Sequence, residues 1–168
     1  LEYAAPGMQL ILLGRRQDVL EQLAVRCRAR GADVQTHAFD LRETDELRRW
    51  ISACCAEHTP DLIIANAGLN TNIGPHGKGE PFADVRSLVE VNLLSVMALV
   101  DGALPALRKR GGGQLAIVSS LAAYYGLPAT PTYCATKAGL KAYGTSLRGW
   151  LRSEHIRVSV ILPGYVSS

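Results

Sequence analysis

A tyrosine and a lysine stand four positions apart in the segment TPTYCATKAGL, residues 130–140. Thr130 can cap a helix and Pro131 suits its first position, so the segment predicts a helix with Tyr133 in its first turn. Tyr133 and Lys137 then lie one turn apart on the same face. An ammonium group and a helix N-terminus both stabilise a phenolate. A phenol in this setting can exchange a proton with a substrate oxygen near neutral pH.

The Tyr133–Lys137 pair alone is equally consistent with an ordinary helix surface, so other residues must point to the same place. Ser119 and Ser120 end an apolar stretch that leads into the predicted helix, and Ser120 precedes Tyr133 by thirteen residues. A hydroxyl group at the carboxyl end of a strand and a phenol at the start of the next helix can converge on one carbonyl oxygen.

Five apolar stretches predict strands, and amphipathic stretches between them predict helices. The predicted strands are 8–13, 32–39, 61–65, 114–119 and 157–162, and the predicted helices are 16–30, 43–58, 84–110 and 131–154. The last three strands are nearly continuous in apolar or small residues, as in parallel strands covered on both faces. This alternation predicts one α/β domain with a Rossmann-like, doubly wound parallel sheet and helices on both faces.

Sheets of this kind bind ligands at the carboxyl ends of their strands. Small or polar residues follow all five predicted strands: Gly14-Arg15-Arg16, Asp40-Leu41, Asn66-Ala67-Gly68, Ser119-Ser120 and Pro163-Gly164. At any single strand end, the general preference of loops for such residues is the simpler explanation. Five strand ends that face one edge predict a binding crevice.

The pattern GGQLAIVSSLAAYYGLPATPTYCATKAGL, with NAG at 66–68 and Asn92 in VEVNLLS, resembles the classical short-chain dehydrogenases/reductases. The resemblance runs from about residue 8 to the end of the chain. It implies that Tyr133 is the catalytic acid/base, that Lys137 favours its phenolate and holds the nicotinamide ribose, and that Ser120 polarises the carbonyl. It also implies that Asn92 holds a water linking Lys137 to solvent. The alternative for Asn92 is a polar residue on a solvated helix face.

The same resemblance predicts the cofactor contacts. Asn66, Ala67 and Gly68 line the adenine side, Asp40 and Leu41 flank the adenine ring, and Pro163, Gly164 and Val166 close over the nicotinamide. In the family, an acidic residue at the end of the second strand favours NAD, whereas here this position is Gly14, followed by Arg15 and Arg16. A guanidinium group binds a 2′-phosphate that a carboxylate would repel. The sequence therefore predicts NADP(H) in preference to NAD(H).

The ends of the sequence lack parts that the family resemblance leads one to expect. In the family, a first strand and a glycine-rich diphosphate loop (T-G-x-x-x-G-x-G) precede the strand at 8–13, and substrate-covering helices follow the PGYV segment. The sequence is therefore predicted to be an interior fragment that lacks the first strand and the glycine-rich loop.

The composition limits the kinds of partner that the protein is expected to bind. The four cysteines show no C-x-x-C spacing, which favours neither a metal site nor a disulfide framework and fits a reducing cytoplasm. The net charge is +3 with scattered basic residues, so nucleic-acid binding is not expected, and no uninterrupted apolar run reaches membrane-spanning length. The predicted helices 84–110 and 131–154 are expected to form a subunit interface, as in the homodimers and homotetramers of the family. Small residues of the second helix (Ala138, Gly139, Ala142 and Gly144) would permit a second copy to approach closely.

The leading hypothesis is hydride transfer between NADP(H) and a small-molecule carbonyl or secondary alcohol. One alternative is a non-catalytic cofactor sensor or scaffold, although a sensor need not keep the proton donor. Another is an epimerase or dehydratase of the extended branch, which shares the tyrosine–lysine pair but is less consistent with the NAG and PGYV segments. The loop at 69–82 is expected to line the pocket entrance, but its residues name no substrate.

Overall fold

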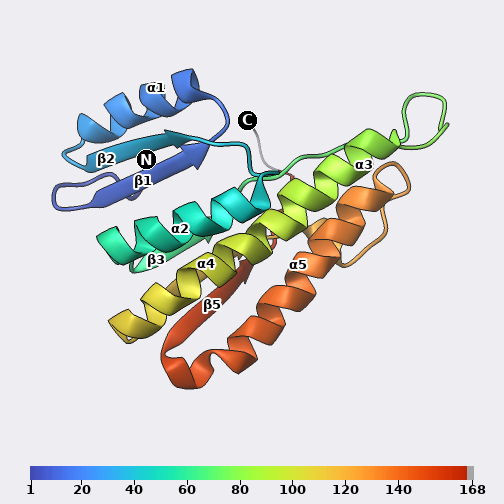
Figure 1. Ribbon diagram of the computed structural model, residues 1–168. Helices are drawn as coiled ribbons and strands as arrows, with labels where there is room; N and C mark the ends of the chain where they lie inside the picture. The colour runs from blue at the N-terminus through green and yellow to red at the C-terminus, as the bar shows by residue number, and fades with distance from the viewer. Residues whose placement is uncertain (166–168) are drawn as a thin grey trace. The chain divides into compact units, whose positions relative to one another are not determined.

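Parallel strands alternate with helices along the chain (Figure 1), and the computed structural model describes residues 1–165. The strands are β1 (Gln9–Gly14), β2 (Asp33–Ala38), β3 (Leu62–Ala65), β4 (Gly113–Val118) and β5 (Ile156–Ile161). The α-helices are α1 (Gln17–Arg28), α2 (Thr44–His58), α3 (Phe82–Val89), α4 (Ser95–Arg110) and α5 (Pro131–Trp150). A π-helical turn, η1 (Glu90–Leu94), joins α3 to α4, and two 3-10 turns are η2 (Leu121–Ala123) and η3 (Arg152–Glu154). Every predicted strand and helix is present.

The chain divides into two compact units, Leu1–Leu41 and Arg42–Ser168. That both fold as one domain stays a prediction. In the first unit, β1 and β2 form a two-stranded parallel sheet that pairs Gln9 with Asp33 and Gly14 with Ala38. Its small core gathers Ala4, Ala24, Cys27, Ala32 and Val34.

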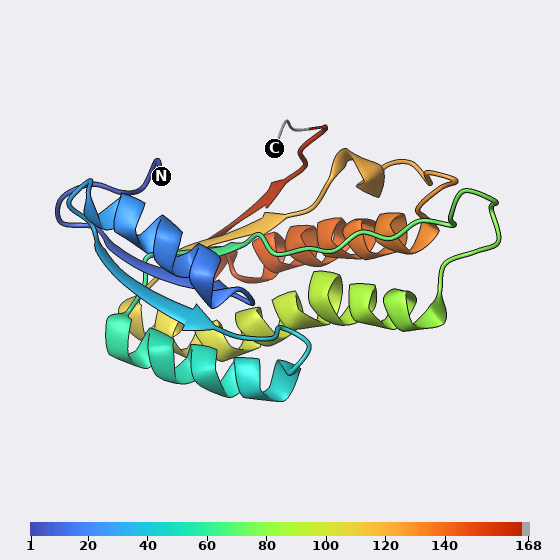
Figure 2. The ribbon, with the colours of Figure 1, turned by 90° about the horizontal axis from the view of Figure 1, so that it is seen from above.

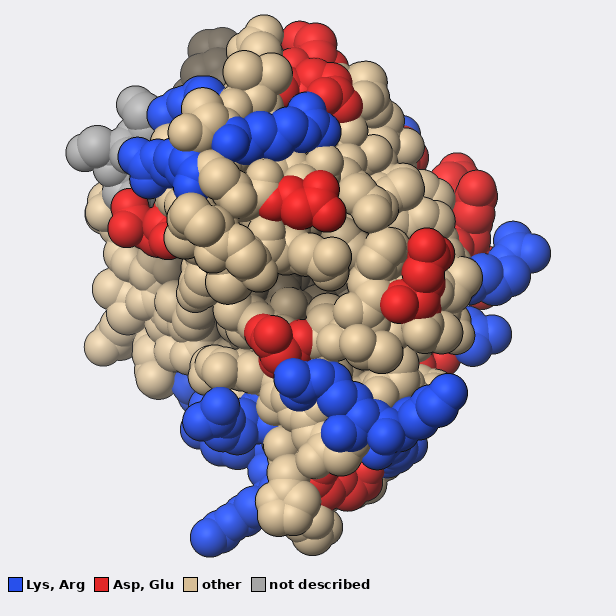
Figure 3. Space-filling view, turned by 90° about the vertical axis from the view of Figure 1, so that its left-hand side faces the viewer, with Lys and Arg blue, Asp and Glu red and all other residues tan. Residues whose placement is uncertain are grey.

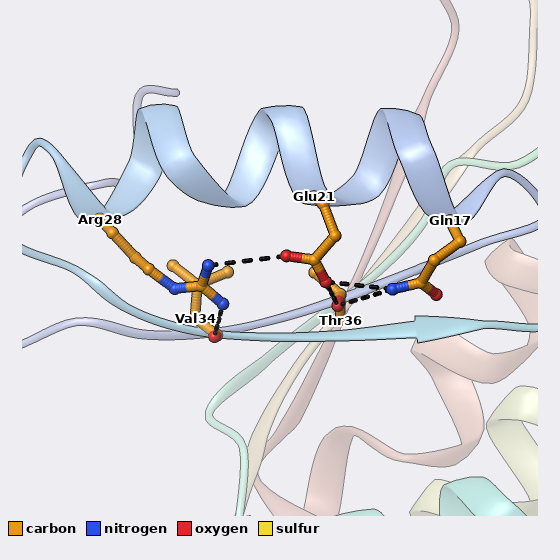
Figure 4. A network of polar contacts seen from close by, with 5 residues as sticks. All are labelled: Gln17, Glu21, Arg28, Val34 and Thr36. Carbon is orange, nitrogen blue, oxygen red and sulfur yellow. Dashed lines mark hydrogen bonds and ion pairs between the residues drawn. The ribbon is translucent and has the colours of Figure 1, made fainter.

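Polar side chains also join α1 to β2 in this unit (Figure 4). Arg28 donates from Nη2 to the Val34 carbonyl at 2.7 Å and forms an ion pair with Glu21 at 3.6 Å. Gln17 donates to Oε1 of Glu21 at 3.0 Å, and the Thr36 hydroxyl donates to the same oxygen. We call these four side chains the α1–β2 network. Both partners of its ion pair keep nearly half of their side-chain surface exposed.

In the second unit, β3, β4 and β5 form a three-stranded parallel sheet with β4 in the centre. Helices α2, α4 and α5 lie side by side against one face of this sheet (Figures 1 and 2). Leu107, Leu115, Ile117 and Leu140 are almost completely buried between the two layers. The predicted α/β, Rossmann-like class is therefore confirmed. In the described part of the chain, β3 pairs only with β4.

A glycine permits the close packing of α5 on the sheet. A Cβ atom at Gly144 would lie 2.5 Å from Cγ2 of Val160 on β5, so no larger residue fits without movement. Five residues earlier, a Cβ atom at Gly139 would lie 3.4 Å from the side chain of Leu93 in η1. These two small residues therefore serve packing within the chain, whereas Ala138 and Ala142 of the same helix are exposed.

The helical stretch Phe82–Arg110 is longer and more apolar than the sequence analysis suggested. By length and composition it could cross a membrane, and its most apolar window is 56% buried inside the protein. Burial of this kind is also typical of a core helix. The predicted single helix is interrupted by η1, where the hydrogen bonds span one residue more than in an α-helix.

Candidate active site

Lys137 is the buried cation of the predicted site. Its side chain lies on the second turn of α5, and the residue is only 4% exposed. Nζ donates to the Val118 carbonyl at the end of β4, at 2.9 Å, and lies 5.7 Å from the centroid of the Tyr133 ring. Burial lowers the pKa of the Lys137 amine because the ammonium form loses its water. The pair predicted from the sequence therefore places a desolvated cation beside a phenol.

The carboxyl end of β4 is attached directly to α5. The Ser119 hydroxyl donates to the Lys137 carbonyl at 2.7 Å, which sequence analysis did not anticipate. Ser120 caps η2, and its Oγ accepts a hydrogen bond from the Ala122 N–H at 3.1 Å. Because η2 packs against α5, Ser120 lies on the segment next to the helix that carries Tyr133. The hydroxyl proton of Ser120 can still be donated, since the Ala122 bond occupies only a lone pair.

Asn92 lies in the middle of the π-helical turn and is fully buried. Its Oδ1 accepts from the Leu69 N–H at 2.7 Å, and its Nδ2 donates to the Leu69 carbonyl at 2.9 Å and to Oγ1 of Thr136 at 3.2 Å. The alternative of a polar residue on a solvated face is therefore wrong. A water-holding role for Asn92 stays a prediction.

The NAG turn follows β3 and reaches the same place. A Cβ atom at Gly68 would lie 3.5 Å from both Oδ1 of Asn92 and Nζ of Lys137. Both polar atoms are thus next to the backbone of the NAG turn. Asn66 and Ala67 are exposed.

The segment after β5 completes this edge of the sheet. The Pro163 carbonyl accepts from the Leu121 N–H at 3.0 Å, and a Cβ atom at Gly164 would lie 3.4 Å from the Leu121 side chain. Val166 lies outside the described residues. The ends of β3, β4 and β5 therefore lie at one edge of their sheet, and a binding crevice formed by all five strand ends stays a prediction.

The other predicted cofactor residues belong to the first unit. Gly14 ends β1, and its carbonyl accepts from the Phe39 N–H at 2.8 Å. Arg15 and Arg16 follow it and are exposed, while Asp40 and Leu41 follow β2 and are partly buried. Since β1 and β2 are parallel, these five residues lie at the carboxyl edge of their two-stranded sheet.

Two residues at the site were missed as functional candidates. Thr136 is 2% exposed; it donates to the Tyr133 carbonyl at 2.8 Å and accepts from Asn92. Thr136 stands among the small residues that follow Tyr133 in the sequence, and this position was only a weak signal for a role at the site. Glu80 accepts from the Thr132 N–H at 3.1 Å, and no sequence signal joined it to a helix 52 residues away. The prediction that Thr130 caps α5 is wrong, because its side chain makes no capping hydrogen bond.

Two hollows flank this region. One, of about 390 Å³, is formed by the loop at 71–81 with residues such as Asn72, His76 and Lys78. The other, of about 460 Å³, lies between the segment 122–128 and the Ala135 and Ala138 side of α5. The loop at 71–81 therefore encloses a concave surface, and its place at the entrance of a substrate pocket stays a prediction.

The described residues give little support for a reactive cysteine, a metal site or a nucleic-acid-binding surface. Burial raises the pKa of the Cys55 thiol to about 11, and the Sγ atom of buried Cys134 accepts from the Leu127 N–H at 3.2 Å. Within residues 1–165, no group of three or more His, Cys, Asp or Glu side chains could hold a metal ion. On the face shown in Figure 3, basic side chains form separate groups with acidic side chains between them. That distribution differs from the continuous basic stripe of nucleic-acid-binding proteins.

A parallel α/β fold with small and polar residues at its strand ends is the architecture of dinucleotide-binding proteins. The sequence model described as short chain dehydrogenase matches residues 1–168. An uncharacterized oxidoreductase from Myxococcus xanthus is 34% identical over 166 residues, which are 98% of this chain and 65% of that protein. The ketoacyl reductase HetN from Nostoc sp. is 31% identical over 159 residues, 94% of this chain and 55% of that protein.

Solved structures agree. The crystal structure of a metagenomic short-chain oxidoreductase in complex with NADP has a TM-score of 0.85 and 30% identity, and the match covers 94% of this chain and 72% of that one. The chain belongs to the classical short-chain dehydrogenase/reductase family of oxidoreductases. It spans about two thirds or less of the curated relatives named above, so the activity, substrates and partners of the whole protein are proposals.

Proposed function

We propose that the protein is an NADP(H)-dependent oxidoreductase that interconverts a carbonyl compound and a secondary alcohol. One observation carries the proposal: the buried Lys137 ammonium lies 5.7 Å from the Tyr133 ring, at the edge of the sheet where three strands end. A buried cation next to a phenol stabilises the phenolate more than an exposed one would, because water screens it less.

Each residue then has a definite task. Tyr133 donates its phenolic proton to the carbonyl oxygen in reduction and takes it back in oxidation. Lys137 stabilises the phenolate left behind, and Ser120 donates a hydrogen bond to the same substrate oxygen. NADP(H), when bound, supplies or accepts the hydride. Asn92 acts indirectly: its two hydrogen bonds to the backbone of Leu69 hold the NAG turn in place next to Lys137.

The chain's own residues are compatible with this cofactor. The space that a Cβ atom at Gly68 would fill is open in front of Lys137, so a ribose hydroxyl can approach the amine. Arg15 and Arg16 are exposed at a strand end, where guanidinium groups suit a 2′-phosphate. The metagenomic relative was crystallised with NADP. These observations support NADP(H) in preference to NAD(H).

A second copy of the chain is part of this proposal. Ala138 and Ala142 are exposed on α5, beside the hollow between α5 and the segment 122–128. A homodimer or homotetramer that packs on this face would cover it.

The proposal is tested with Tyr133→Phe in the intact protein. The variant should lose carbonyl reduction across a panel of ketones and aldehydes while it binds NADPH as the wild type does, because only the proton is removed. Turnover within threefold of the wild type would show that another group supplies the proton. Cys134→Ala, a change at a buried neighbour, serves as the control for local packing.

A further inference from the structure

The first turn of α5 is capped by a residue from a distant loop. Pro131 occupies the first helical position, and the hydroxyl of Thr130 lies 3.8 Å from Sγ of Cys134 instead of meeting a backbone N–H. Oε2 of Glu80 accepts from both the backbone N–H and the hydroxyl of Thr132. A carboxylate at a helix N-terminus is stabilised by the unpaired N–H groups and by the helix dipole.

A second bond attaches the same loop. The Ile73 N–H donates to the Ala129 carbonyl at 3.0 Å, just before α5 begins. Where the loop starts, Leu69 is held by Asn92. The loop is thus fixed at its start by the π-helical turn and later by the beginning of the helix that carries Tyr133.

Glu80 is not the residue that packing alone would favour at this place. Its second oxygen, Oε1, is enclosed and has no hydrogen-bond partner among the described residues. Enclosing a carboxylate oxygen without a partner is unfavourable. The bonds of Oε2 to Thr132 offset this cost, and Thr132 is the residue directly before Tyr133.

We propose that Glu80 is a positioning residue: by capping α5 through Thr132 it fixes the first turn of the helix, and with it the direction of the Tyr133 phenol. This inference rests on the proposed function. A proton donor must lie within hydrogen-bond reach of the substrate oxygen, and a displacement of about 1 Å can reduce turnover about a hundredfold. Without its cap, the first turn of a helix frays. Tyr133 lies in that turn.

Kinetics of the intact protein test the proposal with four variants. Glu80→Ala removes the cap, and Glu80→Gln keeps an acceptor oxygen in the same place. Thr132→Val removes only the hydroxyl, and Glu46→Ala is the control because it removes an exposed glutamate from the start of α2. We expect kcat to fall about 10- to 100-fold in Glu80→Ala with an unchanged Kd for NADPH. Glu80→Gln should recover to within about threefold of the wild type, and Glu46→Ala should match the wild type.

A double variant separates positioning from general destabilisation. If Glu80 acts through Thr132, Glu80→Ala combined with Thr132→Val should be no slower than Glu80→Ala by more than about twofold. Multiplicative losses would overturn the proposal. So would a kcat of Glu80→Ala within threefold of the wild type, or a Glu80→Gln variant as slow as Glu80→Ala.

Hydrogen exchange provides a readout that needs no substrate. The backbone amide of Thr132 should exchange about tenfold faster in Glu80→Ala, with little change in Glu80→Gln, since exchange follows local opening of the first turn. If the protein reduces no carbonyl compound, the proposed function fails while the exchange result still decides whether Glu80 holds the turn. Unchanged exchange at Thr132 in Glu80→Ala would refute the positioning role.

Discussion

Two polar networks of this protein differ in how much water surrounds them. The α1–β2 network of the first unit joins four side chains (Figure 4), and the two partners of its ion pair keep nearly half of their side-chain surface exposed. In the second unit, four polar residues at the candidate site are each 4% exposed or less: Asn92, Thr136, Lys137 and Ser119. Both networks join a helix to a neighbouring segment, but only the second is almost completely removed from solvent.

The difference determines what each network can do. When an exposed ion pair is broken, water takes the place of the lost partner. Such a pair therefore contributes only about 0–1 kcal/mol to the free energy of unfolding. A buried network leaves unpaired groups behind when one member is removed. We therefore expect the buried network to be both the stability-critical and the catalytic one, and the exposed network to be tolerant of change.

The largest effect on stability is expected from Asn92→Leu. The change leaves both the N–H and the carbonyl of Leu69 without their partner at a partly buried place, and it also removes the amide that binds Thr136, so the free energy of unfolding should fall by about 2–4 kcal/mol. Urea denaturation measures this, with Asn72→Leu, an exposed asparagine of the same loop, as the control. If the free energy of unfolding fell by less than about 1 kcal/mol, the loop would have relaxed around the change. The degree of burial would then not determine which of the two networks matters more for stability.

Arg15→Asp is expected to separate ligand binding from stability in the first unit. An exposed guanidinium contributes little to folding, but its replacement should reduce NADPH affinity roughly ten- to a hundredfold and shift preference toward NADH. Titration with both cofactors in the intact protein measures the ratio. An unchanged ratio would assign the 2′-phosphate to Arg16 or to another group.

Lys137→Met tests the cost of burying the amine. The pKa of Lys137 is lower in the folded than in the unfolded protein, so the unfolded state binds more protons between the two values. The stability of the wild type should therefore rise, relative to the variant, as the pH increases through the folded-state pKa toward about 10.4, the unfolded value. Thermal melts of both proteins between pH 6 and 10 measure the difference, and a constant gap would contradict a desolvated amine.

The smallest effect is expected from Glu21→Gln. The new amide side chain would keep an acceptor for Thr36 and lose only the charge facing Arg28, so the free energy of unfolding should change by less than about 0.5 kcal/mol. The difference should shrink further in 1 M salt. A loss above about 2 kcal/mol would show that the exposed network is as sensitive as the buried one.

Local patterns in the sequence predicted the elements and the proximity of Tyr133 and Lys137. The strands and helices follow from apolar periodicity, and the Tyr133–Lys137 spacing places both side chains together on any helix. These features depend on residues close in the chain, so a single sequence contains them.

Contacts between distant segments could not be predicted in the same way. The cap of α5 comes from Glu80 in an irregular loop, although Thr130 was the obvious local candidate. Asn92 binds the backbone N–H and carbonyl of Leu69. Since backbone groups of this kind are common to nearly all residue types, the residue at position 69 gives no signal for the contact. The π-helical turn has no periodicity of its own, because one extra residue per turn disturbs the pattern too briefly to be recognised.

That extra residue gives the helix two different partners. Before and within the π-helical turn, α3 and η1 pack against α5, and beyond it α4 packs against α2. One residue corresponds to a rotation of about 100° around the helix axis. The π-helical turn therefore separates two apolar stripes of the helix, one that faces α5 and one that faces α2. Deleting a single residue from 90–94 would bring the stripes into phase, and only one of the two neighbours could then keep its contact.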